Sequence, residues 1–256
     1  MAVKLKSNDE LKIMREAGQI VGRTLEQLRS MIKPGLNLLE IERFVHDEFR
    51  RVGAKETFLH YVPSPKYPPY PSNICISIND QLVHGIPRDR TLKEGDIVTL
   101  DLGATYRGYV GDAAITVGVG SVTPEAAQLM RVTEDSLWSG IRAARTGKWL
   151  NDVRGAIEDT IRPYGYGIVK GYGGHGVGRD MHEEPHVENF RQRAKGIPLR
   201  NGLVLALEPM VTLGNPDVAE GPDGWTVSTK DGSLCCHFEH TIAIREGHEA
   251  EVLTLA

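Results

Sequence analysis

The feature of this sequence that most constrains its fold is a segment that occurs twice. Residues 35–53 and 147–165 align without a gap, and five of the 19 positions are identical, including the glycine at each end. Apolar positions are kept as well, since Ile41, Val45 and Phe49 correspond to Val153, Ile157 and Ile161. An internal repeat of this kind predicts two similar structural units within one chain.

Each copy belongs to a predicted pair of helices. A capping-box pattern at residues 7–10 opens a helix that Pro34-Gly35 ends, and a second helix runs from Asn37 to Gly53. In the second half, Thr123 caps a helix that reaches about Arg145. Another helix spans residues 151–164 and ends at Gly165.

Strand-like segments follow each helix pair, at residues 73–78 and 97–119 and again at 203–213 and 236–244. Five prolines between Tyr61 and Pro71 predict a surface loop there. We therefore expect an α+β fold of one domain, residues 1–256, with pseudo-symmetric halves at about residues 7–119 and 120–250. A site at the seam between the halves would draw side chains from both.

The overall charge and composition exclude several classes of protein. With 30 Lys and Arg against 34 Asp and Glu, the net charge of -4 gives no basic excess for DNA. The longest apolar run, residues 203–207, is too short to span a membrane. No apolar signal segment precedes Ser7, and three cysteines do not make a disulfide framework. We expect a cytoplasmic protein.

Two acids lie within a predicted β-hairpin, residues 97–117. A turn centred between Tyr106 and Arg107 would place Asp101 directly across from Asp112 on the same face. Like charges at opposed positions repel, which predicts that something positive lies between them. Both acids could instead face solvent near the turn, but apolar neighbours place them inside the strands.

Two further acids stand in apolar surroundings. Glu208 ends the run Leu203–Leu207, and Glu239 lies within the predicted strand 236–244. A buried carboxylate is costly unless it is paired or bound to a metal. A salt bridge to a core arginine is the alternative for each.

His175 lies in a stretch with five glycines, residues 171–178. Glycines let the backbone approach a ligand closely and can fix one imidazole in a narrow site. A phosphate-binding loop is the alternative, but no Lys-Ser or Lys-Thr pair follows. The setting favours a metal ligand.

The string His182-Glu-Glu-Pro-His186 matches the zincin motif, which requires a helix. Pro185 disfavours a helix there, so we reject a zincin site. The remaining candidates, two Asp, two Glu and one His, are rich in hard oxygen ligands. Such sets suit Mn, Mg or Fe(II), and four carboxylates can hold two divalent ions that activate a water.

Several segments resemble motifs of the methionine aminopeptidase family, in its short bacterial-like type I form, from about residue 7 to the C-terminus. They include Asp101-Leu-Gly, Gly111-Asp112, Gly174-His-Gly-Val-Gly178, Leu207-Glu-Pro-Met-Val211 and Phe238-Glu-His-Thr241. The resemblance implies the pita-bread fold, two pseudo-symmetric halves of antiparallel sheet backed by helices, with a dinuclear metal site at the seam.

The same resemblance implies a role for each site residue. The expected metal ligands are Asp101, Asp112, His175, Glu208 and Glu239, of which Asp112 and Glu239 would bridge two ions. Glu208 would also act as the general base, and His84 and His182 would bind the substrate and the developing oxyanion. The methionine side chain would enter a pocket built from Tyr70, Cys75, Met181 and Trp225. The two divalent ions would be Mn, Fe(II) or Co, with Zn or Ni also accommodated.

The implied activity is hydrolytic removal of the initiator methionine from nascent proteins whose second residue is small. Its partners would be nascent polypeptide N-termini, with a transient ribosome contact, no DNA and no membrane, and the chain would be a monomer. One alternative is a protein of the same fold that binds peptides without catalysis. Another is an Xaa-Pro peptidase, although similar enzymes usually carry an additional N-terminal domain.

Overall fold

Four α-helices form where the sequence predicts them in the computed structural model, which describes residues 3–256. Met1 and Ala2, part of the segment in which no signal peptide is predicted, lie outside the described residues. Helix α1 spans Asn8–Met31 and α2 spans Leu38–Val52, each with a complete capping box. Gly53 ends α2 in the left-handed conformation, with a φ of 72°.

The second helix pair differs slightly from the prediction. Helix α3 spans Pro124–Ala143, two residues shorter than expected. Helix α4 spans Leu150–Ile161, and its predicted last turn is a 3-10 helix, η1, at Arg162–Tyr164. Pro163 explains the tighter turn, because it has no backbone N–H to donate. Gly165 ends this segment, as predicted, with a φ of 71°.

The strands of both halves form one continuous sheet of nine strands. Its main path is β1-β4-β5-β14-β9-β7-β8, while β2 pairs with β4 and β15 pairs with β14. The bounds are β1 Lys55–Glu56, β2 Cys75–Ile78, β4 Ile97–Tyr106, β5 Tyr109–Gly118, β7 Gly174–Gly176, β8 Glu183–Val187, β9 Val204–Leu207, β14 Glu239–Ala243 and β15 Glu251–Val252. The antiparallel pair β5 and β14 joins the two halves.

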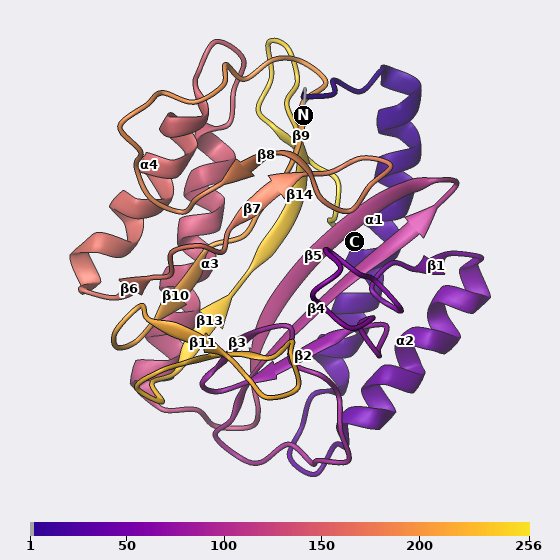
Figure 1. The fold of residues 1–256 in the computed structure, drawn as a ribbon, viewed down its shortest axis with the longest axis vertical. Helices are drawn as coiled ribbons and strands as arrows, with labels where there is room; N and C mark the ends of the chain where they lie inside the picture. The colour runs from indigo at the N-terminus through magenta and orange to yellow at the C-terminus, as the bar shows by residue number, and fades with distance from the viewer. Residues whose placement is uncertain (1–2) are drawn as a thin grey trace.

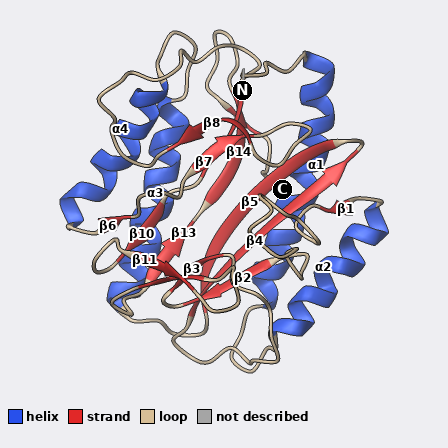
Figure 2. Cartoon of the chain, in the orientation of Figure 1, coloured by secondary structure: helices blue, strands red, loops and turns tan. Residues whose placement is uncertain are grey.

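Two smaller antiparallel sheets complete the fold. One has the order β13 (Cys235–His237), β10 (Met210–Thr212) and β6 (Gly167–Ile168). The other has the order β11 (Val218–Glu220), β12 (Val227–Thr229) and β3 (Gln81–Val83). Figures 1 and 2 show α1 and α2 on the right, α3 and α4 on the left, and the strands running between and across them.

The observed register corrects the predicted hairpin. Gly103, not Asp101, lies opposite Asp112, and Asp101 lies opposite Ala114. The turn is centred one residue later than predicted, because Arg107 and Gly108 both adopt positive φ, 49° and 80°. Such a two-residue turn matches the twist of a hairpin. The two acids remain on one face as diagonal neighbours, so their charges still lie close together.

Two segments predicted as single strands are each interrupted. Residues 203–213 form β9 and β10, separated by Glu208 and Pro209. Residues 236–244 form β13 and β14, separated by Phe238. At these breaks both segments leave the large sheet, in which β9 pairs with β14. They pair with each other again in a small sheet, as β10 and β13. Pro209 cannot donate to the large sheet, and the break leaves the side chains of Glu208 and Glu239 at the junction.

The core lies between the helices and the large sheet, and residues such as Val21, Ile41, Val153 and Ile157 are fully buried in it. The repeated apolar positions of the two halves therefore have the same role, which is to pack a helix against the sheet. No helix among residues 3–256 combines the length and apolar character that a membrane crossing requires.

Candidate metal centre

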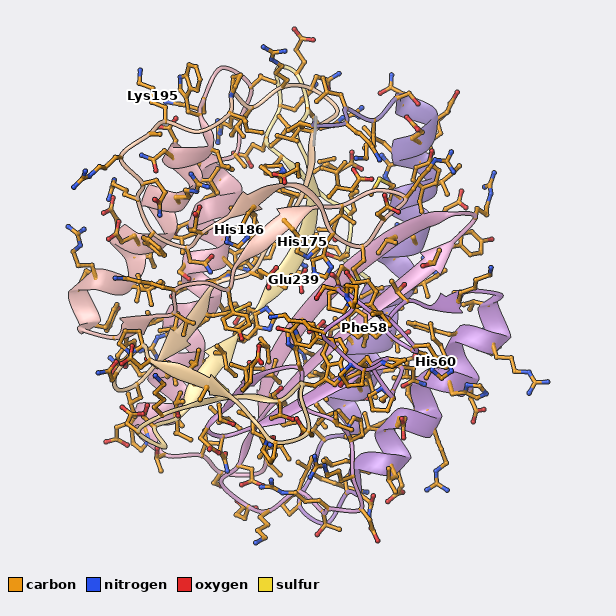
Figure 3. All side chains as sticks on the ribbon, in the orientation of Figure 1. Phe58, His60, His175, His186, Lys195 and Glu239 are labelled. Carbon is orange, nitrogen blue, oxygen red and sulfur yellow. The ribbon has the colours of Figure 1, made fainter. Side chains whose placement is uncertain are left out.

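All eleven predicted site residues line the same cavity, which has a volume of about 230 Å³. They are Tyr70, Cys75, His84, Asp101, Asp112, His175, Met181, His182, Glu208, Trp225 and Glu239. Residues of both halves contribute, so the cavity lies at the predicted seam. Figure 3 shows His175 and Glu239 close together near the centre of the molecule, with Phe58, another lining residue, to their right.

The acids reach this cavity from the centre of the large sheet. Asp112 lies within β5, Glu239 begins β14, and Glu208 directly follows β9. Asp112, Glu208 and Glu239 are 1%, 7% and 2% exposed. Asp101 is half-buried in β4 and lies opposite Cys75 of β2. Three neighbouring strands and the end of a fourth thus direct carboxylates to one point.

His175 is held so that one ring nitrogen faces the acids. Its Nδ1 donates to the carbonyl oxygen of Gly176 at 2.9 Å. Its Nε2 then lies 3.5 Å from Glu208 Oε1 and 3.8 Å from Asp112 Oδ2. A Cβ at Gly174 would overlap the carbonyl oxygen of Ala206, so glycine is required for β7 to pack this closely.

The donor set fits a divalent cation. Asp112, His175 and Glu239 offer ligand atoms that all lie within 4.8 Å of one another. Asp101 Oδ1, Asp112 Oδ1 and Glu239 Oε1 are buried without a hydrogen-bond partner. Asp112 and Glu208 lie within 4 Å of histidines, and across residues 3–256 none of the four acids pairs with a lysine or arginine, which removes the alternative of core salt bridges. When they are ionised, buried carboxylates of this kind need a cation to offset the loss of hydration.

The electrostatics of the cavity lead to the same conclusion. Burial raises the pKa of Asp101 to about 7. Burial raises the pKa of Asp112 well above its usual value, and the charge of Asp101 adds to this. The pKa values of Glu208 and Glu239 are raised in the same way, by burial first and by the neighbouring acids second. A bound cation would reverse these shifts, because it stabilises the charged carboxylates.

An apolar wall closes one side of the cavity. Phe58, Tyr70, Cys75 and Trp225 form a buried cluster, and Met181 packs against it. The rings of Tyr70 and Trp225 meet edge to face with centroids 5.1 Å apart. Such a surface of aromatic rings and sulfur suits a flexible, polarisable side chain.

The two predicted substrate-binding histidines line the same cavity. His182 has its ring centroid 4.2 Å from that of His175, and its Nδ1 is 2.6 Å from the hydroxyl of Tyr61. His84 meets the ring of Trp225 edge-on at 6.0 Å. Burial lowers the pKa of His84 to about 4, so its imidazole is neutral at pH 7.

Residues 183–187 form strand β8, so the zincin string does not lie on a helix, as predicted. The predicted surface loop also contributes to the cavity, which is lined by Tyr61 at the start of the loop and by Tyr67 within it. Another residue that sequence reasoning missed is His237, whose Nε2 lies 3.6 Å from Glu208 Oε2. The available signal was its spacing of two from Glu239, which places both on one face of an extended chain.

The fold and this donor set define a metal-dependent hydrolase. The chain belongs to metallopeptidase family M24, whose model matches residues 12–246. A methionine aminopeptidase of Aquifex aeolicus is 45% identical over 95% of this chain and 96% of its own length. The crystal structure of a methionine aminopeptidase from Thermotoga maritima superposes with a TM-score of 0.95, at 39% identity, and both chains are covered completely.

The fold is also shared with enzymes named for another substrate. A prolidase from Pyrococcus furiosus superposes with a TM-score of 0.77 at 23% identity, over 98% of this chain and 65% of the prolidase. This likeness concerns the α+β pita-bread fold alone. The much closer match to the methionine aminopeptidases in identity and in covered length agrees with the family resemblance of the sequence motifs.

Proposed function

We propose that this chain is a metalloaminopeptidase that hydrolytically removes the N-terminal methionine from new proteins when the second residue is small. The observation that carries the proposal is a single cavity with two unlike walls. One wall is a cluster of buried carboxylates and an imidazole, and the other is the aromatic cluster with Met181. A peptide whose first side chain packs against the apolar wall would present its amino group and first peptide bond to the acids.

In this proposal Asp101, Asp112, His175, Glu208 and Glu239 would hold two divalent ions. The count is supported by the four carboxylates, which offset the charge of two dications. When bound, the ions lower the pKa of a water and stabilise negative charge on the scissile carbonyl. Mn, Fe(II) and Co fit the oxygen-rich set best, and Zn and Ni can also use it.

The protein groups move the protons and orient the peptide. Glu208 would accept the proton of the attacking water and deliver it to the leaving amine. His84 and His182 would donate hydrogen bonds to the peptide and to the developing oxyanion. The hydroxyl of Tyr61 at His182 Nδ1 supports this role, because it limits rotation of the ring.

The proposal can be tested with three substrates. Metal-loaded protein is expected to release free methionine from Met-Ala-Ser, and more slowly from Met-Leu-Ser because of the bulky second residue. Ala-Pro-Ser is included to detect an Xaa-Pro peptidase. Release of alanine without release of methionine would favour that alternative, and no release with Mn, Co or Fe(II) would favour a protein that only binds peptides.

We further propose that the chain acts as a monomer in the cytoplasm on N-termini that leave the ribosome. Free cysteines support this location, since Cys75, Cys235 and Cys236 are all unpaired, as is usual in a reducing compartment. The substrate itself supports a transient ribosome contact, because the initiator methionine of a new chain first becomes accessible as the chain leaves the ribosome. Co-sedimentation with ribosomes and light scattering of the free protein test the contact and the oligomeric state.

A further inference from the structure

His237 is a buried histidine that the proposed function leaves unused. It ends strand β13 and is 1% exposed, yet neither ring nitrogen has a hydrogen-bond partner among residues 3–256. Its backbone is fixed on both sides, because its N–H donates to Thr116 Oγ1 and its carbonyl oxygen accepts from the same hydroxyl. Because the residue is buried, its ring has no access to bulk water.

The imidazole faces one side chain of the metal centre. His237 Nε2 lies 3.6 Å from Glu208 Oε2, while Glu208 Oε1 lies 3.5 Å from His175 Nε2. The two oxygens of Glu208 thus face two different histidines. His175 lines the cavity, whereas His237 does not and lies behind Glu208.

We propose that His237 is a positioning residue that donates a hydrogen bond from Nε2 to Glu208 Oε2 and so keeps Oε1 directed at the cation and the reacting water. The inference rests on the proposed function of Glu208. The separation exceeds an ordinary N–H···O bond by roughly 0.6 Å, and hydrogen bonds of active sites are commonly long before the ligands bind. Placing the proton on Nε2 leaves only an acceptor unpaired at Nδ1, which proteins tolerate better than an unpaired N–H.

Ligation of a cation by His237 itself is the alternative, since Glu208, His237 and Glu239 offer atoms within 4.8 Å of one another. The position of the ring behind Glu208 favours the hydrogen bond. Fixing a ligating carboxylate from behind typically changes metal affinity by about 10- to 100-fold. The two roles predict different results for a variant that can donate a hydrogen bond but offers no imidazole.

The experiment compares His237→Leu and His237→Gln by titrating metal-free protein with Co²⁺. The leucine variant is expected to bind Co²⁺ about 10- to 100-fold more weakly, with a lower kcat and an unchanged KM for Met-Ala-Ser. In the glutamine variant the Co²⁺ affinity and kcat should both lie within about threefold of those of the unmodified protein. His46→Gln, which removes an exposed histidine bound to Glu56, is the control and should change neither.

X-ray absorption of the Co²⁺-loaded proteins separates the two roles. Equal imidazole scattering in the glutamine variant and the unmodified protein supports positioning, and a loss of imidazole scattering would overturn it in favour of ligation. Unchanged Co²⁺ affinity and kcat in the leucine variant would also overturn it. Should that variant fail to fold, His237→Asn replaces it, because its amide is too short to reach Glu208. Failure of the proposed activity is separate, since it would leave Co²⁺ binding intact without release of methionine.

Discussion

Asp112 is the residue on which the electrostatics of the centre depend most. It is almost fully buried, it lies diagonally across the hairpin from Asp101, and its Oδ1 has no hydrogen-bond partner. Asp112→Asn keeps the volume of the side chain and removes one charge. We expect kcat to fall at least about 10³-fold, because several kcal/mol of charge stabilisation is lost with the cation.

The same substitution should stabilise the metal-free protein at pH 8, because it removes repulsion between buried acids. Thermal unfolding without metal and metal content after dialysis distinguish these effects. A variant that keeps both its metal and near-normal turnover would show that Asp112 does not bridge the ions.

Tyr61 supports His182 through a single hydrogen bond of 2.6 Å. Tyr61→Phe removes that bond alone, and a net loss of about 1 kcal/mol corresponds to a roughly fivefold lower kcat/KM. Tyr67→Phe is a matched control, because its hydroxyl is in the same loop but donates to Glu220 at 2.8 Å. Equal losses in the two variants would mean that the loop, and not His182, is disturbed.

The residues of the centre were predictable to different degrees. Asp101, Asp112, Glu208 and Glu239 are acids within apolar segments, which is an unfavourable setting that only a partner can explain. For His237 the only signal is its spacing of two from Glu239, and that is weak, because a lone histidine in a strand is also compatible with an ordinary core position. Its importance depends on a contact with a residue 29 positions away, which is visible only in the fold.

At the scale of elements, the hairpin of β4 and β5 depends on close contact with α1. A Cβ at Gly111 would lie 2.6 Å from the backbone N and Cα of Gly18. Because both partners are backbone, Gly111→Ala has to displace the helix, and we expect destabilisation of about 3 kcal/mol, at the upper end for overpacking. Metal affinity should fall as well, because the displaced strand carries Asp112.

Gly35→Ala is the control for this prediction. Its φ is +86° and no atom lies within 4 Å of the added Cβ, so it incurs only the conformational cost of about 1–2 kcal/mol. Urea unfolding of the two variants, together with Co²⁺ titration, provides the measurement. A Gly111→Ala protein with unaltered Co²⁺ affinity would show that the hairpin does not depend on α1 for its position.

N-capping residues and C-terminal glycines made the helices predictable, because each lies within a few residues of the helix end that it determines. Register and strand breaks depend on other parts of the chain. The turn is centred at Arg107 and Gly108, one residue later than predicted; Gly108 favours positive φ, but nothing in the neighbouring residues indicates that Arg107 adopts it too. The break at Glu208 and Pro209 became visible only once β10 was seen to pair with β13.

For the whole molecule, the repeat predicted where the site would lie. Each half contributes two helices and part of the large sheet, and β5 pairs with β14 at their junction. Asp101 and Asp112 come from the first half, and His175, Glu208 and Glu239 come from the second. The unfavourable free energy of burying these acids therefore opposes the packing of the two halves against each other. Removal of the cations should weaken the entire fold and not only the cavity.

The pH dependence of the metal-free protein provides a test of this coupling. Buried Asp112, Glu208 and Glu239 have pKa values raised well above those of an unfolded chain, so the folded state retains protons that the unfolded state loses. The stability that protonation provides is present at low pH and is lost as the pH rises through the folded pKa values. The buried histidines have lowered pKa values, about 3 for His175 and His237, and above pH 7.5 they are neutral in both states.

Between pH 7.5 and 8.5 the free energy of unfolding of the metal-free protein should therefore fall by about 1.4 kcal/mol per pH unit for each proton retained. Saturating Co²⁺ should abolish this dependence, because the bound ions keep the carboxylates ionised. Burial also raises the pKa of the Cys235 and Cys236 thiols, but both lie outside the cavity, so any slope they cause persists with Co²⁺. Urea unfolding at both pH values measures the effect, and equal slopes with and without Co²⁺ would contradict carboxylates that are neutralised by cations.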